Sequence, residues 1–440
     1  MRELNDTIAA VATSAGEGGI AIVRISGENA LSILKKLFVP AHEGEFEHGR
    51  MRFGRVKDSS GQTVDEVMAV FFASPNSYTR QDVAEIHTHG GRVCGEVLRL
   101  AVECGARAAD RGEFTYRAFM NGRIDLSRAE AVMSLISAGS ERARRASVNQ
   151  LEGGVSAMIG RAREKLNEAA SLIDAAADFP EEIDEDVTFT RVRGEAEKVL
   201  AQLERMADKR YAHITENGAN VVIAGRPNAG KSSIMNALLS CERSIVTEIP
   251  GTTRDSVSES TFIRGLRVTL TDTAGIRETG DKIEKIGVER ARALMDRADC
   301  VVLVLDGSES LTQEDEELLS MKDSRFVVAV NKNDRGCVLH EDGITVSAAT
   351  GEGIGELTDA IYEAVSAGED DEKLVNLRHV DCAARAAECL RRVCGAPEGT
   401  FLDLLRDDIL RAADILGEIT GENVTENTID EIFSRFCVGK

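Results

Sequence analysis

The sequence has few aromatic and few basic residues, and both shortages limit what the protein can be. It contains no tryptophan, and aromatic side chains make up 4% of its 440 residues, as is common in helix-rich proteins. Lysine and arginine number 53 against 75 acidic residues, which gives a net charge of −22. Such a charge argues against broad nonspecific binding to nucleic acid, but it leaves room for a nucleic-acid substrate held by a local basic patch or by a partner.

Two further absences concern the cellular compartment. The nine cysteines include no CxxC pair and no zinc-type spacing, which predicts reduced, mainly structural thiols in a cytosolic protein. No apolar run is long enough to cross a membrane, and the run at residues 8–12 is too short for a signal peptide. We therefore expect a soluble protein located in the cytoplasm.

Length and hydrophobic patterning predict more than one domain. A chain of 440 residues with 42% hydrophobic side chains has room for two or three. Residues 1–115 mix strands and helices in an α+β pattern, and residues 116–215 carry long amphipathic helices. Residues 216–368 alternate strands with helices as in a parallel α/β sheet, and helices resume over residues 369–440. An α/β domain inserted into a helical domain is the simplest arrangement.

The expected elements follow from hydrophobic periodicity. Strands are predicted over residues 19–25, 64–72, 219–224, 266–271, 326–330 and 344–346. Helices are predicted over residues 92–104, 129–137, 157–176, 191–210, 233–239, 400–416 and 426–436. The acidic stretch 179–186 is expected to be a solvated connection between helices, and residues 368–373 a hydrophilic linker.

The most informative stretch is Gly225–Ser232, with the sequence GRPNAGKS. It fits the phosphate-binding pattern GxxxxGK[ST], and it lies between a predicted strand and a predicted helix. Glycines in such a loop let backbone N–H groups surround phosphates, and the N-terminus of the next helix adds the positive end of its dipole. We predict that Lys231 reaches the β- and γ-phosphates and that Ser232 ligates Mg²⁺.

Three elements that follow in order identify the nucleotide. One strand ends in Asp272–Gly275 (DTAG), where the acid can approach Mg²⁺ through water and the glycine N–H can meet the γ-phosphate. Another ends in Asn331–Asp334 (NKND), and the Asp334 carboxylate matches the adjacent N1–H and N2–H donors of guanine. A third leads to Ser347–Ala348, which fits a backbone donor to guanine O6. The order predicts GTP, and the domain resembles the Ras-like G domains of the translation-factor type.

Hydrolysis needs a group that orients the attacking water. Ras-type GTPases have a glutamine directly after DxxG, but here that residue is Ile276, which has no hydrogen-bonding group. Thr253, in the run Gly251–Asp255, is the candidate threonine that ligates Mg²⁺ when the γ-phosphate is present. The candidates for orienting water are the acids that follow DTAG, namely Glu278, Asp281 and Glu284.

Asn228 and the run Gly251–Asp255 (GTTRD) are similar to those of potassium-dependent GTPases. In those proteins the loop before switch I folds over a K⁺ ion that occupies the place of an arginine finger. The similarity implies a side-chain oxygen ligand from Asn228 and backbone carbonyl ligands from Thr247, Ile249 and Thr252.

Seven stretches outside the G domain carry a family resemblance. They are Asn5–Ile8, Gly18–Gly27, Asp82–Gly91, Arg111–Thr115, Ala118–Asn121, Asp125–Ala131 and the terminal Cys437–Lys440. Through them the whole chain resembles the MnmE (TrmE) family of tRNA uridine-34 modification GTPases. The terminal CxGK sequence in a chain with a G domain is very specific to that family.

The resemblance implies an activity, cofactors and partners. The activity is a potassium-dependent GTPase that, with the flavoprotein MnmG (GidA), forms 5-carboxymethylaminomethyl or aminomethyl uridine at wobble position 34 of certain tRNAs. The one-carbon unit comes from 5,10-methylenetetrahydrofolate or 5-formyltetrahydrofolate, while FAD and NADH act on the partner. A homodimer through the N-terminal domain, a heterotetramer with MnmG, and paired G domains during hydrolysis are implied, with no membrane association.

The resemblance also selects residues for these roles. The family's catalytic glutamate corresponds to Glu284, and Lys231 and Thr253 are the further catalytic residues. The better-known members have lysine where this chain has Arg123, which keeps the charge but changes the geometry. The folate-binding residues implied are Arg24, Glu85, Arg123 and Lys440, with Cys437 as a possible functional thiol.

The predicted GTP and metal ligands form one larger set. The predicted Mg²⁺ ligands are Ser232 and Thr253, and the predicted K⁺ ligands are Asn228, Thr247, Ile249 and Thr252. The predicted GTP-binding residues are Asn228, Ala229, Gly230, Lys231, Ser232, Ser233, Thr247, Glu248, Ile249, Pro250, Gly251, Thr252, Thr253, Asp272, Thr273, Ala274, Gly275, Asn331, Lys332, Asp334, Ser347, Ala348 and Ala349.

Two other functions fit part of the pattern. A GTPase switch in ribosome assembly, as in Era- or Der-like proteins, would have a similar G domain. Those proteins, however, carry an RNA-binding module in place of the N-terminal region and the CxGK end. The other is a folate-binding regulatory module with a vestigial nucleotide site, and the intact Lys231, Ser232, Thr253 and Asp272 argue against it.

Overall fold

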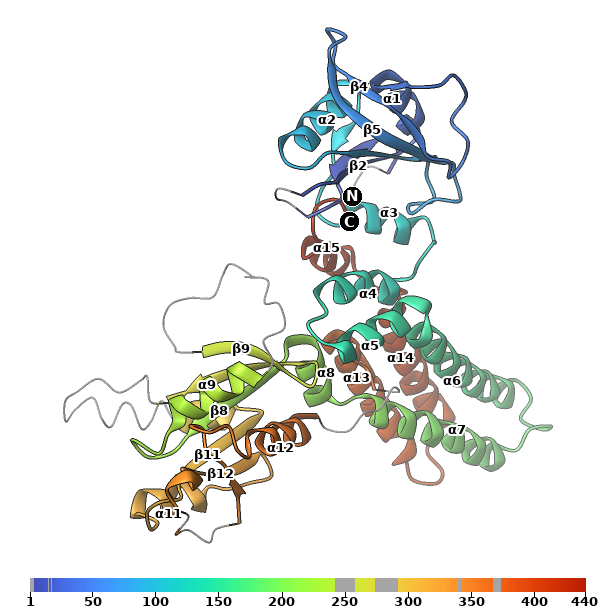
Figure 1. The fold of residues 1–440 in the computed structure, drawn as a ribbon. Coiled ribbons are helices and arrows are strands. Elements are labelled where there is room, and N and C mark those ends of the chain that lie inside the picture. Colours follow the sequence, from blue (N-terminus) through green and yellow to red (C-terminus); the bar gives the residue numbers. More distant parts are fainter. Residues whose placement is uncertain are drawn as a thin grey trace. The chain divides into compact units, whose positions relative to one another are not determined.

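The computed structural model describes residues 4–14, 16, 18–241, 258–273, 292–336, 338, 342–366 and 373–440. The chain divides into two compact units (Figure 1). The first unit comprises residues 1–133, 150–159 and 417–440, and the second comprises residues 134–149 and 160–416. No helix in the described ranges is both long and apolar enough to cross a membrane.

The first unit is built on a seven-stranded sheet with two helices, α1 and α2. The elements are β1 (Ile8–Val11), β2 (Ala21–Ser26), α1 (Ala30–Leu37), β3 (Phe38–Pro40), β4 (Arg52–Lys57), β5 (Thr63–Phe72), β6 (Val83–Thr88), α2 (Arg92–Glu103) and β7 (Arg107–Ala108). The strand order is β3-β4-β5-β6-β2-β1-β7. All neighbours pair antiparallel except β1 and β7, which are parallel.

Alternation along the central strands separates a core face from a polar face. Val23 and Ile25 of β2 and Ile86 of β6 are fully buried in one core with residues of α1 and α2. Side chains of a strand alternate between its two faces, so Arg24 and Glu85 belong to the opposite face. The register places these two residues directly across from each other.

The first unit also includes three other helices and a buried ion network. They are α3 (Glu113–Met120), the start of α4 (Leu126–Ser137), and α15 (Glu426–Ser434). Arg117 of α3 is completely buried and donates to Glu113 at 3.0 Å and to the Asp6 backbone carbonyl at 2.7 Å. Arg107 pairs with the same glutamate at 2.6 Å. The network ties the chain near Asp6 to α3.

The second unit contains a helical part and an α/β part. The helices of the helical part, some of which extend into the first unit, are α5 (Glu141–Glu152), α6 (Gly154–Asp178), α7 (Glu185–Met206), α8 (Lys209–Asn217), α13 (Leu377–Cys394) and α14 (Leu402–Thr420). Helix α7 packs along α13, where Arg391 pairs with Glu204 at 2.9 Å (Figure 1). The Leu374 N–H donates to the Met206 carbonyl at 3.1 Å, and Lys373 pairs with Asp208 at 2.9 Å.

The prediction of one helix over residues 191–210 is wrong at both ends. Helix α7 begins at Glu185, because the Asp184 side chain accepts from the backbone N–H groups of the first turn and caps the helix. It ends at Met206, because Asp208 caps a new helix, α8, by accepting from the Tyr211 N–H. The acidic stretch 179–186 is therefore a connection only up to Asp184.

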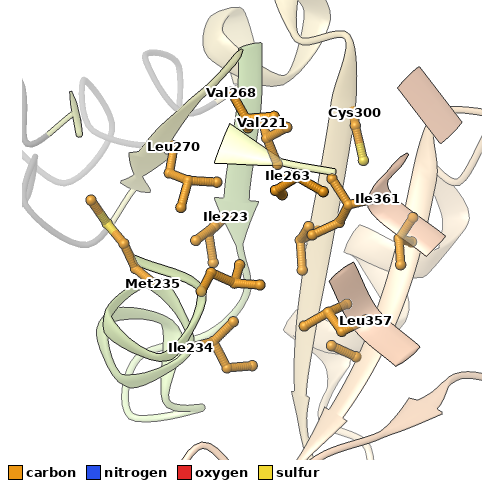
Figure 2. Close-up of a cluster of buried hydrophobic side chains, with 14 of the residues drawn as sticks. Val221, Ile223, Ile234, Met235, Ile263, Val268, Leu270, Cys300, Leu357 and Ile361 are labelled. Atoms are coloured by element: carbon orange, nitrogen blue, oxygen red, sulfur yellow. The ribbon is translucent and has the colours of Figure 1, made fainter. Parts of the chain in front are cut away.

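The α/β part is a six-stranded sheet with helices on both faces. Its elements are β8 (Ala219–Ala224), α9 (Lys231–Cys241), β9 (Ser258–Ile263), β10 (Leu266–Asp272), β11 (Cys300–Asp306), α11 (Gln313–Ser320), β12 (Phe326–Asn331), β13 (Ile344–Thr345) and α12 (Ile354–Ser366). The strand order is β13-β12-β11-β8-β10-β9. Figure 2 shows the core between the sheet and helices α9 and α12, with Ile223, Ile234 and Leu357 among its side chains.

The sheet departs from the expected all-parallel arrangement at one edge. Strands β10, β8, β11, β12 and β13 are parallel, but β9 pairs antiparallel with β10. Arg264 and Gly265 form the two-residue loop between them, with φ of 49° and 75°. Positive φ at both positions is the geometry of a type I′ hairpin, which makes neighbouring strands antiparallel.

Candidate functional site

The phosphate-binding loop lies between the carboxyl end of β8 and the N-terminus of α9. The Lys231 ammonium donates to the carbonyl oxygens of Gly225 and Arg226, both at 2.8 Å. These bonds hold a buried cation inside the loop, next to backbone N–H groups at a helix N-terminus. That arrangement is suited to neutralising phosphate oxygens.

Two of the loop's glycines are required by close packing. A Cβ on Gly225, which has φ of 143°, would lie 2.3 Å from the Val304 carbonyl oxygen. A Cβ on Gly230, which has φ of 98°, would lie 2.1 Å from Asn331 Nδ2. Both positions combine a left-handed backbone with direct contact to a neighbouring strand end, so only glycine fits them.

A pair of hard oxygen groups lies beside the loop. Ser232 Oγ, at the start of α9, donates to Asp272 Oδ2, at the end of β10, over 2.6 Å. Thr273 Oγ1 donates to the Ile223 carbonyl at 3.0 Å and so ties this strand end to β8. A hydroxyl and a carboxylate are ligands that Mg²⁺ favours, so Ser232 and Asp272 fit a magnesium site.

The base-binding candidates meet at the carboxyl ends of β12 and β13. Asn331 Nδ2 donates to the Ala229 carbonyl at 2.9 Å, which joins the predicted base loop to the phosphate loop. The Ala348 N–H donates to Asn331 Oδ1 at 3.1 Å. Ser347 Oγ donates to Asp334 Oδ1 at 2.7 Å. This bond orients the Asp334 carboxylate, which is itself exposed.

Several predicted residues lie outside the described part of the chain. Among the predicted K⁺ ligands, Asn228 is described: it is exposed, with φ of 62°. The predicted residues outside the description are Thr247, Glu248, Ile249, Pro250, Gly251, Thr252, Thr253, Ala274, Gly275 and Glu284, and so are Ile276, Glu278 and Asp281.

Sequence reasoning missed one acid of this site, Asp306. It is buried at the end of β11, and its Oδ2 accepts from Lys332 Nζ at 2.5 Å. Burial acts to raise the pKa of Asp306, but hydrogen bonds from Lys332 and Ser308 outweigh it and hold the pKa below its usual value. The sequence did contain one signal for it: Asp306 stands at the end of an apolar run, as Asp272 and Asn331 do.

A second site lies in the first unit, on the polar face of the sheet. Arg24 Nε pairs with Glu85 Oε1 at 2.8 Å. The guanidinium carbons of Arg24 and Arg123 lie 5.3 Å and 4.7 Å from the centre of the Tyr78 ring. A cavity of about 530 Å³ opens here, and its lining includes Phe72, Tyr78, Arg80, Val83, Glu85 and Arg123.

The terminal CxGK segment belongs to the same region. Arg24 Nη1 lies 3.5 Å from the Gly439 carbonyl oxygen, and the Phe114 N–H donates to the Lys440 carbonyl at 3.2 Å. Burial and the nearby Arg24 charge lower the pKa of the Lys440 ammonium. Cys437 is exposed. The structure therefore brings Arg24, Glu85 and Lys440 near one another.

The electrostatics of Glu85 favour its ionised form. Burial acts to raise its pKa, but His87 and Arg24 outweigh burial and hold the pKa below its usual value. The result is a half-buried carboxylate beside a cavity with aromatic walls. His87 and Tyr78 were not predicted, because nothing in their local sequence marks them; only strand pairing and the loop before β6 place them here.

The α/β part has a phosphate loop and a base loop at the carboxyl ends of its strands, which are the features of a Ras-like GTPase domain. Residues 7–123 match the family model of the GTP-binding protein TrmE N-terminus, and residues 126–437 match that of the MnmE helical domain. Among solved structures, the G domain of the T. maritima FeoB iron transporter is 26% identical to this chain. The alignment covers 33% of this chain and 98% of the FeoB chain, with a TM-score of 0.26.

Full-length relatives identify the family. The tRNA modification GTPases MnmE of Roseiflexus sp. (strain RS-1) and Alkaliphilus metalliredigens (strain QYMF) are 42% and 41% identical to this chain. Each alignment covers 99% of this chain, and 99% and 100% of the respective relative. The chain belongs to the MnmE family of tRNA modification GTPases. The family resemblance and the fold class expected from the sequence are thereby confirmed.

Proposed function

We propose that this protein hydrolyses GTP in a potassium-dependent manner to drive the modification of the wobble uridine of tRNA. The observation that supports this most is the meeting of three strand ends in one site. Lys231 and Ser232 follow β8, Asp272 ends β10, and Asn331 ends β12 with Asp334 shortly after it, all at the same edge of the sheet. Phosphate, metal and guanine ligands are thus within reach of a single nucleotide.

The residues of the site divide the work of phosphoryl transfer. Lys231 neutralises the β- and γ-phosphates, and the backbone N–H groups of the loop orient them. Ser232 and Thr253 would hold Mg²⁺, with Asp272 reaching the ion through water, and the bound ion would supply positive charge to the phosphate oxygens. Glu284 orients the attacking water. Preorganised charge of this kind is usually the largest contribution to such catalysis.

The potassium part of the proposal depends on Asn228 in the phosphate loop. Asn228 has a left-handed backbone and is exposed, so its side chain is accessible to an ion. We propose that its side-chain oxygen and the Thr247, Ile249 and Thr252 carbonyls hold K⁺. A cation there would supply positive charge in the place that an arginine finger takes in other GTPases.

The cavity of the first unit is proposed to bind a reduced folate, either 5-formyl- or 5,10-methylenetetrahydrofolate. The Glu85 carboxylate can accept from the donor edge of a pterin ring, and Tyr78 and Phe72 offer aromatic surface to it. Arg24, Arg123 and Lys440 offer cations for the carboxylates of the glutamate tail. The chemistry of the donor set therefore fits a folate.

The remaining elements of the proposal concern domains and partners. We propose a folate-binding and dimerisation domain over residues 1–115, a helical domain over 116–215 and 369–440, and an inserted G domain over 216–368. The proposed assembly is a cytoplasmic homodimer that joins the flavoprotein MnmG in a heterotetramer and acts on tRNA. The proposed product is 5-carboxymethylaminomethyl or aminomethyl uridine, with FAD and NADH acting on MnmG.

Nucleoside analysis of tRNA from cells that lack this protein tests the proposal. We expect the modified wobble uridine to disappear and the unmodified nucleoside to accumulate. Restoring the gene with an Asp334→Asn substitution serves as a control that links the loss to nucleotide binding. An unchanged uridine pattern, combined with defective ribosomal subunits, would instead support a GTPase switch in ribosome assembly.

A further inference from the structure

The buried carboxylate of Asp306 lies between cations from two different loops. Its Oδ2 atom is 2.5 Å from Lys332 Nζ and 3.7 Å from Arg226 Nη2. Its Oδ1 atom accepts from Ser308 Oγ at 2.6 Å and from the Ser308 N–H at 3.1 Å. The side chain is 4% exposed, so solvent screens these interactions little. Both oxygens are therefore fixed, and one of them faces two positive charges.

The two cations belong to opposite ends of the nucleotide site. Arg226 is the second residue of the phosphate loop, and its carbonyl accepts from the Lys231 ammonium. Lys332 is the second residue of the NKxD sequence, two positions before Asp334. In addition, the Gly307 N–H donates to the Asn331 carbonyl at 2.8 Å. The turn after β11 thus contacts the phosphate loop and the base loop together.

The backbone of Lys332 requires such support. Its φ of 70° lies in the left-handed region, which is unfavourable for a residue with a Cβ atom. A residue keeps such a conformation only where its surroundings impose it. The ion pair with Asp306 holds the side chain of Lys332, and the position of Asp334 depends on that turn.

We propose that Asp306 is a positioning residue that couples the phosphate loop to the base loop and thereby sets how long a guanine nucleotide stays bound. The inference rests on the proposed function, because it concerns the same nucleotide site. Asp306 does not touch the reacting atoms. It acts through Lys332 and Arg226. Loss of its charge removes the ion pair of Lys332 and the link to Arg226, which keeps Glu309 and Asp315 as partners.

Dissociation of a fluorescent N-methylanthraniloyl-GDP from the full-length protein, followed by stopped flow, measures this role. The Asp306→Asn substitution keeps the size of the side chain and removes its charge. We expect dissociation to accelerate about ten- to a hundredfold, the range for losing a hydrogen bond to a charged group. Association should change by less than about threefold, because the loops still form. Unchanged dissociation would overturn the proposal.

Glu309→Gln is the matched control. Glu309 pairs with the same Arg226 at 2.6 Å, but its side chain is 61% exposed. Exposed ion pairs contribute little, so dissociation should stay within about threefold of the unsubstituted protein. An equal acceleration in both variants would mean that Arg226, and not Asp306, controls release, and would overturn the proposal.

Further measurements separate positioning from folding. For Asp306→Asn, the KM for GTP should rise while kcat at saturating GTP stays near that of the parent. A merely structural role would lower the melting temperature and leave KM unchanged. If Asp306→Asn does not fold, Ser308→Ala, which removes one hydrogen bond to the same carboxylate, should still accelerate release by about three- to tenfold. No acceleration in Ser308→Ala would then overturn the proposal. If the unsubstituted protein does not bind the probe, the proposed function itself fails.

Discussion

Arg117 and Glu113 form an ion pair of 3.0 Å in which both side chains are completely buried. Without Arg117, Glu113 keeps Arg107 as its remaining cation at 2.6 Å, but the Asp6 carbonyl loses the donor that contacts it at 2.7 Å. We expect Arg117→Met to lower the free energy of unfolding of the first unit by about 3 kcal/mol, the low end for breaking a buried pair, because Arg107 still compensates the glutamate. Urea unfolding followed by circular dichroism measures it. Arg144→Met is the control, because Arg144 pairs with Glu141 on an exposed helix surface and should cost less than about 1 kcal/mol.

The same network makes stability depend on pH. Burial acts to raise the pKa of Glu113, but hydrogen bonds from Arg107 and Arg117 outweigh it and lower the pKa below 4.5, its ordinary value. A carboxyl whose pKa is lower in the folded state stabilises the protein above its unfolded-state pKa, and that stability is lost as the pH falls through the folded-state pKa. We expect the melting temperature to fall as the pH drops below about 4.5. The melting temperature of Arg117→Met should fall less than that of the unsubstituted protein between about pH 6 and pH 3. An equal fall in both proteins would contradict this account.

Base selectivity should depend on Asp334. Its carboxylate is oriented by Ser347 at 2.7 Å and can accept two hydrogen bonds from guanine. Asp334→Asn replaces one acceptor with a donor, which suits the acceptor that xanthine presents at its 2-position. We expect GTP affinity to fall by at least about tenfold and xanthosine triphosphate to be preferred. Competition against a fluorescent nucleotide measures both. Asp342→Asn is the control, because Asp342 is an exposed acid that is not among the predicted nucleotide ligands. Unchanged preference would remove the guanine assignment.

Monovalent cations should control turnover through Asn228. We expect GTP hydrolysis in K⁺ to exceed that in Na⁺ by at least about tenfold, because a cation in place of an arginine finger stabilises transition-state charge. Asn228→Ala should bring the rate in K⁺ down to the rate in Na⁺. Phosphate release at constant ionic strength measures the rates, and equal rates for the unsubstituted protein in both salts would contradict the potassium site.

Reduced-folate binding should depend on Glu85 and Arg24. We expect Glu85→Gln to weaken 5-formyltetrahydrofolate binding by about ten- to a hundredfold, since a charge-assisted hydrogen bond is lost. Isothermal titration calorimetry measures the affinity. Glu66→Gln is the matched control, because Glu66 pairs with Arg55 at 2.8 Å on the same sheet but is exposed and away from the cavity lining. An equal loss of folate affinity in both variants would argue against folate binding in this cavity.

Local patterns predicted the phosphate loop and its flanking strand well. The strand expected over residues 219–224 is β8, because a short apolar run is bounded by Gly218 and Gly225. Periodicity failed at Asp208, where one helix ends and the next begins within three residues, so the apolar spacing continues through the break. The hairpin at Arg264 and Gly265 was missed because it lacks the usual Asn-Gly or Asp-Gly signal.

Contacts between distant segments were beyond a reading of the sequence. Arg24 and Glu85 are 61 residues apart, and only the register of β2 with β6 brings them together. The resemblance named both residues without predicting that they form an ion pair. The ion pairs of Asp306 depend likewise on tertiary structure, because Arg226 lies about 80 residues before it in the sequence and Lys332 lies 26 residues after it.

The hydrogen bond between Leu374 and Met206 has a mechanical consequence for the segment between them. The segment begins after Met206, the last residue of α7, and ends before Leu374, which precedes α13. One hydrogen bond joins these two residues, and the ion pair between Lys373 and Asp208 lies beside it. Because its two ends lie side by side, the segment leaves and rejoins the helices at one place. It can therefore be excised and replaced by a turn of a few residues without stretching the helices that remain.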